Sequence, residues 1–259
     1  MARKHNERFR GRDEITVFGR RAVLEALAAP TVEVEKVACA RTSPREFVDE
    51  LREACAAGGV EMQLRPETDI HRLSGDARND QGVAARVRLT LVEDLERWSD
   101  ALAPPGAGAA VRLLAFDGVT NPQNIGMVIR SALAAGISGV LWPLAGSPWI
   151  NGLIIKASAG TIYRCPVVRA PTLVEGLTSL RRVGFGAFAL ESEGGVDLFA
   201  HEPPRRAVYV VGGETTGLSP EALALCERRL AIPMRGGVES LNAAIAASIL
   251  CFHVARRGG

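Results

Sequence analysis

The sequence has no long hydrophobic run. None of its apolar stretches approaches the roughly 18–20 residues that a membrane-spanning helix requires. The first twelve residues contain no apolar segment, so no signal peptide is predicted either. From these two absences we expect a cytoplasmic protein that does not associate with membranes.

Cysteine and histidine are scarce, with five and four residues respectively. The cysteine number is odd, no two cysteines stand at CxxC spacing, and the histidines are dispersed. A disulfide framework and a zinc site are therefore not predicted, and free thiols in a reducing compartment are. The residues concerned are Cys39, Cys55, Cys165, Cys226 and Cys251, and His5, His71, His201 and His253.

The common phosphate-binding and hydrolase motifs are also missing. Gly184-Phe185-Gly186 lacks the third glycine of a dinucleotide fingerprint. Gly212 and Gly217 have the glycine spacing of a P-loop, but Leu218 follows where the lysine is needed. No G-x-S-x-G elbow occurs. The sequence therefore argues against a standard NAD enzyme, NTPase or serine hydrolase.

The composition is that of an ordinary globular protein with a mild basic excess. The chain has 259 residues, of which 47% are hydrophobic and 23% charged, and a net charge of +2. It is long enough for one large or two smaller domains. A basic tail spans residues 1–14, where Glu7 is the only acidic residue before Asp13. This tail is either a disordered solubilising segment or a flexible arm that contacts phosphates.

Alternating strand-like and helix-like patterns predict an α/β protein of two domains. Residues 15–91 form a small α/β domain, residues 92–110 a linker that contains Pro104-Pro105, and residues 111–259 a second domain. In the second domain, strands separated by helices imply a mainly parallel sheet with helices on both faces.

Several elements carry more specific predictions. The helix at residues 44–57 is expected to bury Phe47, Val48, Leu51 and Cys55, and a strand is expected at Tyr163–Val168. The final helix, Leu241–Arg256, is expected to bury Ile245, Ile249 and Phe252. Ser219 and Pro220 suit the N-cap and first position of the helix that follows them. Trp142 and Trp149 suit either stacking on a base or a place in the core or a dimer interface.

Three polar segments follow predicted strands of the second domain: Asp117–Arg130, Gly212–Leu218 and Pro233–Asn242. Taken singly, each has an ordinary structural explanation, because asparagine is common in turns, Glu214 can complement a helix dipole and Arg130 can be a solvated helix residue. The carboxyl ends of parallel strands meet at one edge of a sheet, where ligands bind. Together the three segments predict one ligand site at this edge.

The residues of these segments resemble three motifs of a known enzyme family, the SpoU/TrmH-type RNA 2′-O-ribose methyltransferases of the SPOUT superfamily. The match holds in order and spacing over the whole second domain. Residues 17–27 and 81–85 are similar to the start and end of the family's small RNA-binding domain, although Asp80 stands where many members have histidine. The motif residues are Asn121-Pro122-Gln123-Asn124-Ile125-Gly126 with Arg130-Ser131-Ala132, then Gly212-Gly213-Glu214-Thr215-Thr216-Gly217-Leu218, then Ile232-Pro233-Met234 with Glu239-Ser240-Leu241-Asn242.

The resemblance implies a fold, a cofactor and an assembly. The second domain is expected to contain a deep trefoil knot, which periodicity alone would never predict. S-adenosylmethionine is the expected cofactor, and the protein is expected to be a homodimer with its active site at the subunit interface. The residues expected to bind the cofactor are Leu190, Gly213, Ile232, Met234 and Leu241.

The same resemblance implies catalytic roles. Arg130 is the candidate that activates the ribose hydroxyl, and Asn124, Glu214, Ser240 and Asn242 are expected to position it, the ribose and the cofactor loops. An arginine side chain ordinarily has a pKa of about 12.5–13.8, which makes it a poor general base unaided. The other role open to it is to bind the neighbouring phosphate and stabilise the developing alkoxide.

The expected reaction is methylation of a ribose 2′-hydroxyl in structured RNA. 23S ribosomal RNA is favoured over tRNA by analogy with the two-domain layout. A tRNA ribose methyltransferase, a catalytically silent ribosome-assembly factor that binds RNA, and a small-molecule-binding protein remain the alternatives. The positive surface needed for RNA is expected from the tail Arg3–Arg12, the first domain, Lys156 and Arg164.

Overall fold

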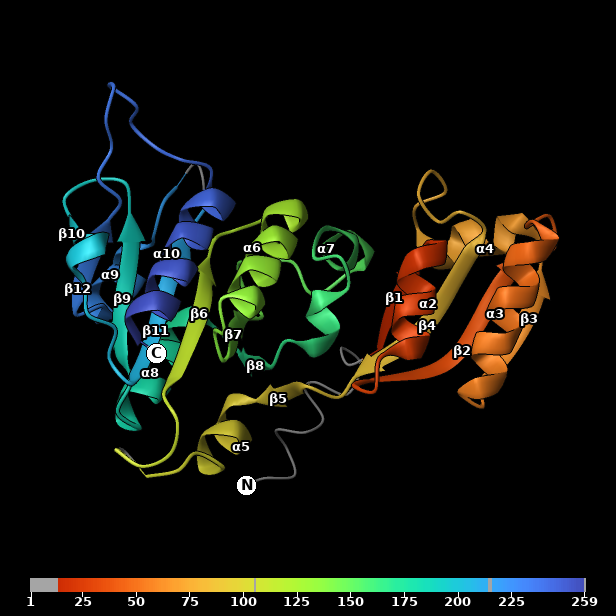
Figure 1. Cartoon of the computed structure of the whole chain (residues 1–259), viewed down its shortest axis with the longest axis horizontal. Coiled ribbons are helices and arrows are strands. Elements are labelled where there is room, and N and C mark those ends of the chain that lie inside the picture. Colours follow the sequence, from red (N-terminus) through yellow and green to blue (C-terminus); the bar gives the residue numbers. More distant parts are fainter. Residues whose placement is uncertain (1–13, 105, 214–215, 259) are drawn as a thin grey trace. The chain divides into compact units, whose positions relative to one another are not determined.

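The structure is a computed structural model that describes residues 14–258 except 105, 214 and 215. It divides into two compact units (Figure 1). Unit 1 comprises residues 14–91 together with Ile150–Arg164, and unit 2 comprises Val92–Trp149 with residues 165–258. Apart from Glu14, the predicted basic tail lies outside the described residues.

Unit 1 is built on a four-stranded mixed sheet in the order β1-β4-β2-β3. β4 is antiparallel to both of its neighbours, whereas β2 and β3 are parallel. Helix α3 buries Phe47, Val48, Leu51 and Cys55, so the predicted inward face is confirmed. The elements are β1 (Glu14–Phe18), α2 (Arg20–Ala28), β2 (Val32–Ala40), α3 (Arg45–Ala57), β3 (Glu61–Arg65), α4 (Glu67–Ser74) and β4 (Val83–Leu89).

The segment Ile150–Arg164 packs with unit 1 although its neighbours in sequence belong to unit 2. It contains α7 (Gly152–Ala157) and the 3-10 helix η1 (Thr161–Arg164). Tyr163 is buried and its hydroxyl donates to the Ala22 carbonyl of α2 at 3.1 Å. The predicted strand Tyr163–Val168 is therefore wrong in its first half, because Tyr163 packs against a helix, and β8 begins only after Pro166.

Unit 2 contains an eight-stranded sheet in the order β10-β12-β9-β11-β6-β7-β8-β5. Every pair of neighbouring strands is parallel, as the alternation of strands and helices predicts. The strands are β5 (Val92–Asp94), β6 (Val111–Asp117), β7 (Gly139–Pro143), β8 (Val167–Ala170), β9 (Gly186–Glu191), β10 (Val196–Asp197), β11 (Arg206–Gly212) and β12 (Arg228–Ala231). The helices are α5 (Leu95–Asp100), α6 (Pro122–Ala134), α8 (Leu173–Arg182), η2 (Leu198–Ala200), α9 (Pro220–Leu225) and α10 (Ala243–Gly258).

Helices cover both faces of this sheet. Leu113 and Ala115 of β6 belong to a core cluster that includes buried residues of α8. Leu114 and Phe116 point to the opposite face, because side chains alternate along a strand, and both are also fully buried. Figure 1 shows α6 and α10 side by side in front of the sheet and α8 behind it.

The predicted linker at residues 92–110 contains ordered elements of unit 2. β5 adds to the edge of the sheet by pairing with β8, and Asp94 lies 3.0 Å from the guanidinium of the buried Arg169. Leu95 of α5 is buried, and Trp98 packs near Phe185 with a ring-centroid distance of 6.1 Å. The linker interpretation fails because apolar residues within the charged stretch reach the core of unit 2.

The buried face of α10 differs from the prediction. Ile245 and Phe252 are each 53% exposed, whereas Ala243, Ala244 and Ala247 are buried. α10 packs against α6, and Ser248 on α10 donates a hydrogen bond to Ser131 on α6 at 2.7 Å. The helix thus buries a different face from the predicted one, and Ile249 is half-buried; besides the three alanines, the buried residues of α10 are Leu250, Cys251, His253 and Val254.

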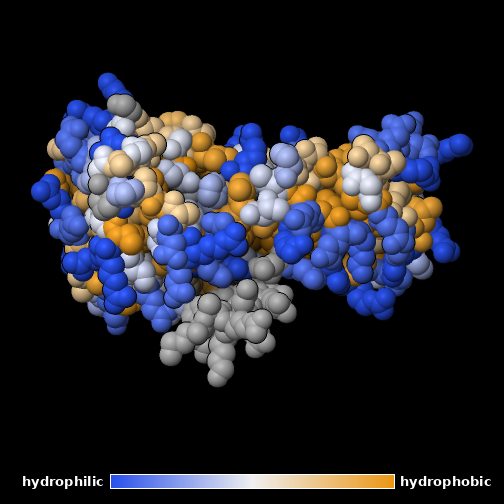
Figure 2. Space-filling model, turned by 90° about the horizontal axis from the view of Figure 1, so that it is seen from below, coloured by the Kyte–Doolittle hydropathy of each residue, from blue (hydrophilic) through white to orange (hydrophobic). Residues whose placement is uncertain are grey.

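The outer surface is mixed in character. On the face drawn in Figure 2, hydrophilic residues cover much of each unit and hydrophobic residues lie in groups between them. Exposed large apolar side chains in the described part of the chain include Met127, Val174, Ile245 and Phe252. None of the helices among the described residues is long and apolar enough to cross a membrane.

Candidate functional site at the carboxyl edge of the parallel sheet

The carboxyl ends of four neighbouring strands in unit 2 converge on one region. β6 ends at Asp117, β9 at Glu191 and β11 at Gly212, and the chain leaves β12 at Ala231. The sheet grows from β6 toward β7 in one direction and toward β11, β9 and β12 in the other. Such a reversal in strand order leaves room for a ligand beyond the strand ends.

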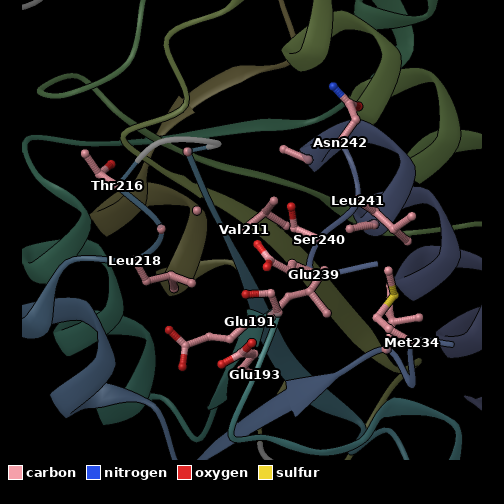
Figure 3. Close-up of a pocket in the computed structure, with 18 residues that line it drawn as sticks. Glu191, Glu193, Val211, Thr216, Leu218, Met234, Glu239, Ser240, Leu241 and Asn242 are labelled. Atoms are coloured by element: carbon pink, nitrogen blue, oxygen red, sulfur yellow. The ribbon is translucent and has the colours of Figure 1, made fainter. Parts of the chain in front are cut away.

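A pocket of about 700 Å³ lies at this edge, and we call it the edge pocket (Figure 3). Its volume falls within the roughly 300–1,000 Å³ typical of small-molecule sites. The sequence-predicted residues Leu190, Gly213, Ile232, Met234 and Leu241 all line it, and so do Ser240 and Asn242. The remaining lining residues are Glu191, Ser192, Glu193, Val211, Gly212, Thr216, Gly217, Leu218, Glu239, Ala243 and Ala246.

The edge pocket combines apolar walls with three carboxylates. Met234 and Leu241 lie on one side and Leu218 on the other, while Glu191, Glu193 and Glu239 bring acidic groups to the same space (Figure 3). Carboxylates accept hydrogen bonds from hydroxyl and ammonium groups and attract positive charge. The pocket therefore suits a ligand with apolar parts, hydroxyls and cationic groups.

Sequence reasoning missed the acidic residues at this edge. Glu191 ends β9 and Glu193 follows two residues later, but the stretch after β9 carries no motif. The position of β9 between β11 and β12 was the missing information. A general rule, that polar residues directly after any parallel strand belong to the ligand edge, would have found both.

Two glycines bring the loop after β11 unusually close to neighbouring backbone. A Cβ on Gly212 would lie 2.5 Å from the Gly217 carbonyl carbon, and one on Gly213 would lie 2.5 Å from the Gly118 oxygen. Real Cβ atoms essentially never approach so closely. Glycine is therefore required at Gly213 by the close approach of the two strand-end loops, and at Gly212 by the tight turn within the loop after β11.

Asp117 ties the loop after β6 to the loop after β11. Its backbone oxygen accepts a hydrogen bond from the Gly213 N–H at 2.9 Å. Its carboxylate oxygen Oδ2 accepts from the backbone N–H of Ser219 at 2.6 Å and from the Ser219 hydroxyl at 2.7 Å. Ser219 is also the N-cap of α9, and Pro220 follows at the first helical position, so both of those predictions are confirmed.

Replacing Asp117 by alanine is expected to loosen this loop. The substitution leaves the half-buried Ser219 N–H without its acceptor, at a cost of about 1–3 kcal/mol. For a protein of this size we expect the melting temperature to fall by roughly 3–10 °C in differential scanning fluorimetry. The melting temperature of Asp117→Asn, which retains an acceptor oxygen, should fall by less. Asp100→Ala, at an exposed helix end, is the control, and an unchanged Asp117→Ala would contradict the role.

The first and third motif segments are joined by their asparagines. The Asn242 side-chain N–H donates to the Asn124 side-chain oxygen at 3.3 Å, and Asn124 is only 3% exposed. Asn242 also accepts a hydrogen bond from the Ala244 N–H at 2.9 Å, at the start of α10. Asn121 is the N-cap of α6, so its role in this unit is to shape the helix start.

Arg130 lies apart from the edge pocket within one chain. It is exposed on α6 and is absent from the pocket lining. Its guanidinium makes no hydrogen bond or ion pair with any residue that the structure describes. The structure therefore groups the five predicted cofactor residues with Ser240 and Asn242, places Asn124 beside them and leaves Arg130 outside. Glu214 lies outside the described residues.

Covalent catalysis by a cysteine is disfavoured. All five cysteines are free, and Cys226 is the only one that is not fully buried. Burial raises the pKa of the Cys226 thiol to about 11, and the nearby carboxylates of Glu191 and Asp117 add to the effect. A thiol with this pKa is protonated at neutral pH and is a poor nucleophile.

Trp142 belongs to the core of unit 2. It is fully buried, and its ring meets Phe116 and Trp149 edge-on at centroid distances of 5.8 and 5.7 Å. Of the two interpretations of Trp142, base stacking is wrong and a core position is correct.

Both units match models of known protein families. Residues 112–252 match the model described as the SpoU rRNA Methylase family. Residues 16–90 match the model described as RNA 2′-O ribose methyltransferase substrate binding.

Individual proteins resemble the chain over nearly its whole length. A 23S rRNA (guanosine-2′-O-)-methyltransferase RlmB of Xylella fastidiosa strain 9a5c is 32% identical over 93% of this chain and 96% of its own. An uncharacterized tRNA/rRNA methyltransferase of Mycobacterium sp. strain KMS is 33% identical over 93% of this chain and 76% of its own. The crystal structure of the SpoU methyltransferase AviRb from Streptomyces viridochromogenes, in complex with AdoMet, superposes with a TM-score of 0.75. It is 25% identical and the match covers 97% of this chain and 92% of AviRb.

Proposed function

The chain belongs to the SpoU rRNA methylase family, and from this premise we propose that it transfers a methyl group from S-adenosylmethionine to a ribose 2′-hydroxyl of structured RNA, with 23S ribosomal RNA as the substrate. The observation that carries the proposal is the edge pocket, because a small-molecule site is built from the second and third of the segments that carry the family resemblance, together with the end of β9. The full-length similarity to a 23S rRNA methyltransferase supports the choice of substrate.

The residues of the edge pocket fit S-adenosylmethionine. When bound, this cofactor supplies an electrophilic methyl group on a positively charged sulfur. Glu191, Glu193 and Glu239 offer carboxylates for its cationic groups and ribose hydroxyls. The glycines of the loop after β11 expose backbone N–H and C=O groups to a planar base, and Met234 and Leu241 offer apolar contacts.

Arg130 is assigned to the RNA rather than to the cofactor. Its exposed guanidinium can form two parallel hydrogen bonds with a phosphate and stabilise negative charge as the 2′-hydroxyl loses its proton. Asn124 and Asn242 hold the start of α6 against the start of α10, and Arg130 lies about two helical turns beyond the start of α6. Glu214 and Ser240 are assigned to positioning the cofactor loops and ribose.

The proposal includes a homodimer whose active site spans the subunit interface. Ile245 and Phe252 on α10 and Met127 on the adjacent α6 are exposed by 53%, 53% and 43%. Grouped exposed apolar side chains mark interaction surfaces, and a two-fold dimer would cover this face. In such a dimer, Arg130, which lies outside the edge pocket of its own chain, would act at the edge pocket of the partner subunit.

Charged substitutions on this face are expected to separate the dimer. Ile245→Asp with Phe252→Asp should convert the protein to monomers in sedimentation velocity, because each buries an unpaired charge at the interface. Methyl transfer should be lost together with the dimer. Val174→Asp on α8, an exposed apolar residue away from α10, is the matched control. A wild-type protein that sediments as a monomer would contradict this part of the proposal.

A deep trefoil knot in unit 2 is also part of the proposal. The chain leaves β12 near one edge of the sheet, yet α10 packs against α6. On the way, residues 232–242 pass beside the loop after β11, since both line the edge pocket. A chain end that passes through the loop formed by an earlier segment is consistent with such a knot.

Methyl transfer to defined RNAs tests the function and separates its alternatives. Purified protein is incubated with methyl-labelled S-adenosylmethionine and in vitro transcripts of 23S ribosomal RNA or total tRNA. We expect label in the 23S transcript. Label in tRNA alone would favour a tRNA enzyme, and RNA binding without label would favour the catalytically silent assembly factor. Absence of salt-sensitive RNA binding would favour a small-molecule-binding protein.

A further inference from the structure

Unit 1 contains a pocket of its own, which we call the unit-1 pocket. Its volume is about 420 Å³, and all of its lining residues belong to unit 1. It is formed where the first residues of α2 and α4, the loop before α3 and the loop before β4 meet. The lining residues are Arg20, Thr42, Ser43, Pro44, Glu67, His71, Ala77, Arg78, Asp80, Gln81 and Gly82.

A buried carboxylate organises one side of this pocket. Asp80 is 1% exposed, and its Oδ1 accepts from the Gly82 N–H at 3.0 Å. Its Oδ2 accepts from the Ser74 hydroxyl and from Nδ1 of His71, each at 2.8 Å. With Nδ1 committed to Asp80, the atom of His71 that remains for a ligand is Nε2, which has no hydrogen-bond partner among the described residues.

Gln81 and Phe47 hold Arg20 in the wall of this pocket. Its guanidinium carbon lies 4.9 Å from the centre of the Phe47 ring, and its Nε donates to the Gln81 carbonyl at 3.4 Å. The Arg20 backbone N–H donates to the Gln81 side-chain oxygen at 2.9 Å. Gln81 has a φ of 54°, in the left-handed region that non-glycine residues rarely adopt. The guanidinium is thus oriented by a ring and by a strained backbone position.

Charged side chains from several elements surround His71. Arg20 and Arg78 are the cations of the pocket wall, and Glu67, one turn earlier on α4, is the exposed anion. Asp80 is the buried anion and already accepts three hydrogen bonds. Beyond the wall, the ammonium group of Lys156 donates to the Asn79 side chain at 3.3 Å. The pocket therefore offers more positive than negative groups to a ligand once His71 is protonated.

We propose that the unit-1 pocket binds a backbone phosphate of the RNA substrate, held by Arg20, Arg78 and the Nε2–H of a protonated His71. Arginine forks and a charged imidazole are strong donors to phosphate oxygens. The naming of RNA as the source of the phosphate rests on the proposed function. The pocket contributes RNA affinity through phosphate contact and takes no part in methyl transfer itself.

Phosphate binding to the unit-1 pocket should depend on pH, and the protonation states of His71 and Asp80 decide whether it strengthens or weakens as the pH falls. The hydrogen bond to Asp80 raises the pKa of His71, burial opposes this, and the charges of Asp80 and Glu67 raise the pKa further. Burial alone would raise the pKa of Asp80, but its hydrogen bonds from His71, Gly82 and Ser74 outweigh this and leave the net pKa below its ordinary value. Asp80 is therefore ionised at neutral pH, and phosphate affinity should rise as the pH falls through the raised pKa of His71.

Filter binding of a 23S ribosomal RNA transcript tests the proposal at pH 6 and pH 8 over a range of salt concentrations. We expect the full-length wild type to bind about fivefold more tightly at pH 6, and His71→Gln to lose this gain. At pH 6, the double variant His71→Gln with Arg78→Ala should lower the slope of log affinity against log salt by roughly 0.7–0.9, the value of one lost phosphate contact, and each single variant should lower it by part of this. Arg52→Ala on α3 removes a cation from the same unit outside the pocket and should leave the slope unchanged.

A second measurement separates this proposal from the proposed function. Inorganic phosphate is titrated into the full-length protein, with the ring ¹⁵N signals of His71 followed by NMR, and a saturable shift that is absent in Arg20→Ala is expected. Transcript binding with the same pH and salt dependence in wild type and His71→Gln would overturn the phosphate pocket and leave the methyltransferase intact. A saturable shift in a protein that never methylates RNA would overturn the function and leave an anion site.

Discussion

Arg130→Ala is expected to lower the rate of methyl transfer to RNA by roughly 10²–10³-fold, the size of effect seen when a donor to a developing oxyanion is removed. The affinity for S-adenosylmethionine, measured by calorimetry, should stay unchanged. The physical reason is position: Arg130 is exposed on α6 and lines no part of the edge pocket.

Two variants sharpen the result for Arg130. Arg130→Lys keeps the charge but loses the planar fork, so it should recover only part of the rate. Arg182→Ala, another exposed arginine on a helix of unit 2, is the matched control and should retain full activity. A loss of cofactor affinity in Arg130→Ala would contradict the assignment of Arg130 to the RNA and of the edge pocket to the cofactor.

Gly213→Ala is expected to weaken the binding of S-adenosylmethionine by on the order of 100-fold, with methyl transfer lost at ordinary cofactor concentrations. The new Cβ would lie 2.5 Å from the Gly118 oxygen, which is backbone and cannot rotate away. The loop would therefore shift and strain the hydrogen bonds from Gly213 N–H to Asp117 and from Gly217 N–H to Gly213.

Gly58→Ala is the control for Gly213→Ala. Gly58 has a φ of −89°, and a Cβ there would meet its nearest neighbour at 3.5 Å, an ordinary contact. This variant should bind cofactor as the wild type does. Wild-type affinity in Gly213→Ala would show that the loop after β11 is not the cofactor loop.

The two variants together test whether the active site crosses the dimer interface. If Arg130 serves the pocket of the partner subunit, mixing Arg130→Ala and Gly213→Ala subunits creates one intact site in each mixed dimer. Random mixing of equal amounts then restores about a quarter of wild-type activity, since half of the dimers are mixed and each has one of two sites. No restoration would place Arg130 and the pocket in the same chain.

Elements and their order were predictable from local pattern. The buried residues of α3 follow from helical periodicity, and Ser219 and Pro220 mark the start of α9. α10 shows where the pattern stops being informative. Ile245 and Phe252 mark an apolar stripe, but the helix buries another face, which includes Ala247, Leu250 and Val254. Which apolar face a helix buries against its own chain depends on the shape of its neighbour.

The edge pocket was predictable where residues carry a motif and was missed where they do not. Gly213, Met234 and Leu241 follow from the resemblance and line the pocket. Glu191 and Glu193 carry no motif, and their place at the edge depends on β9 lying between β11 and β12. The packing of Ile150–Arg164 with unit 1 depends likewise on contacts between segments far apart in sequence.

The chemical identity of the methylated RNA product tests the central claim most directly. A 23S ribosomal RNA transcript treated with the enzyme and S-adenosylmethionine is digested to nucleosides and examined by mass spectrometry. The account predicts one 2′-O-methylated nucleoside, present with the wild type and with Arg182→Ala and absent with Arg130→Ala. A methyl group on a base, or no methylated nucleoside with the wild type, would contradict it.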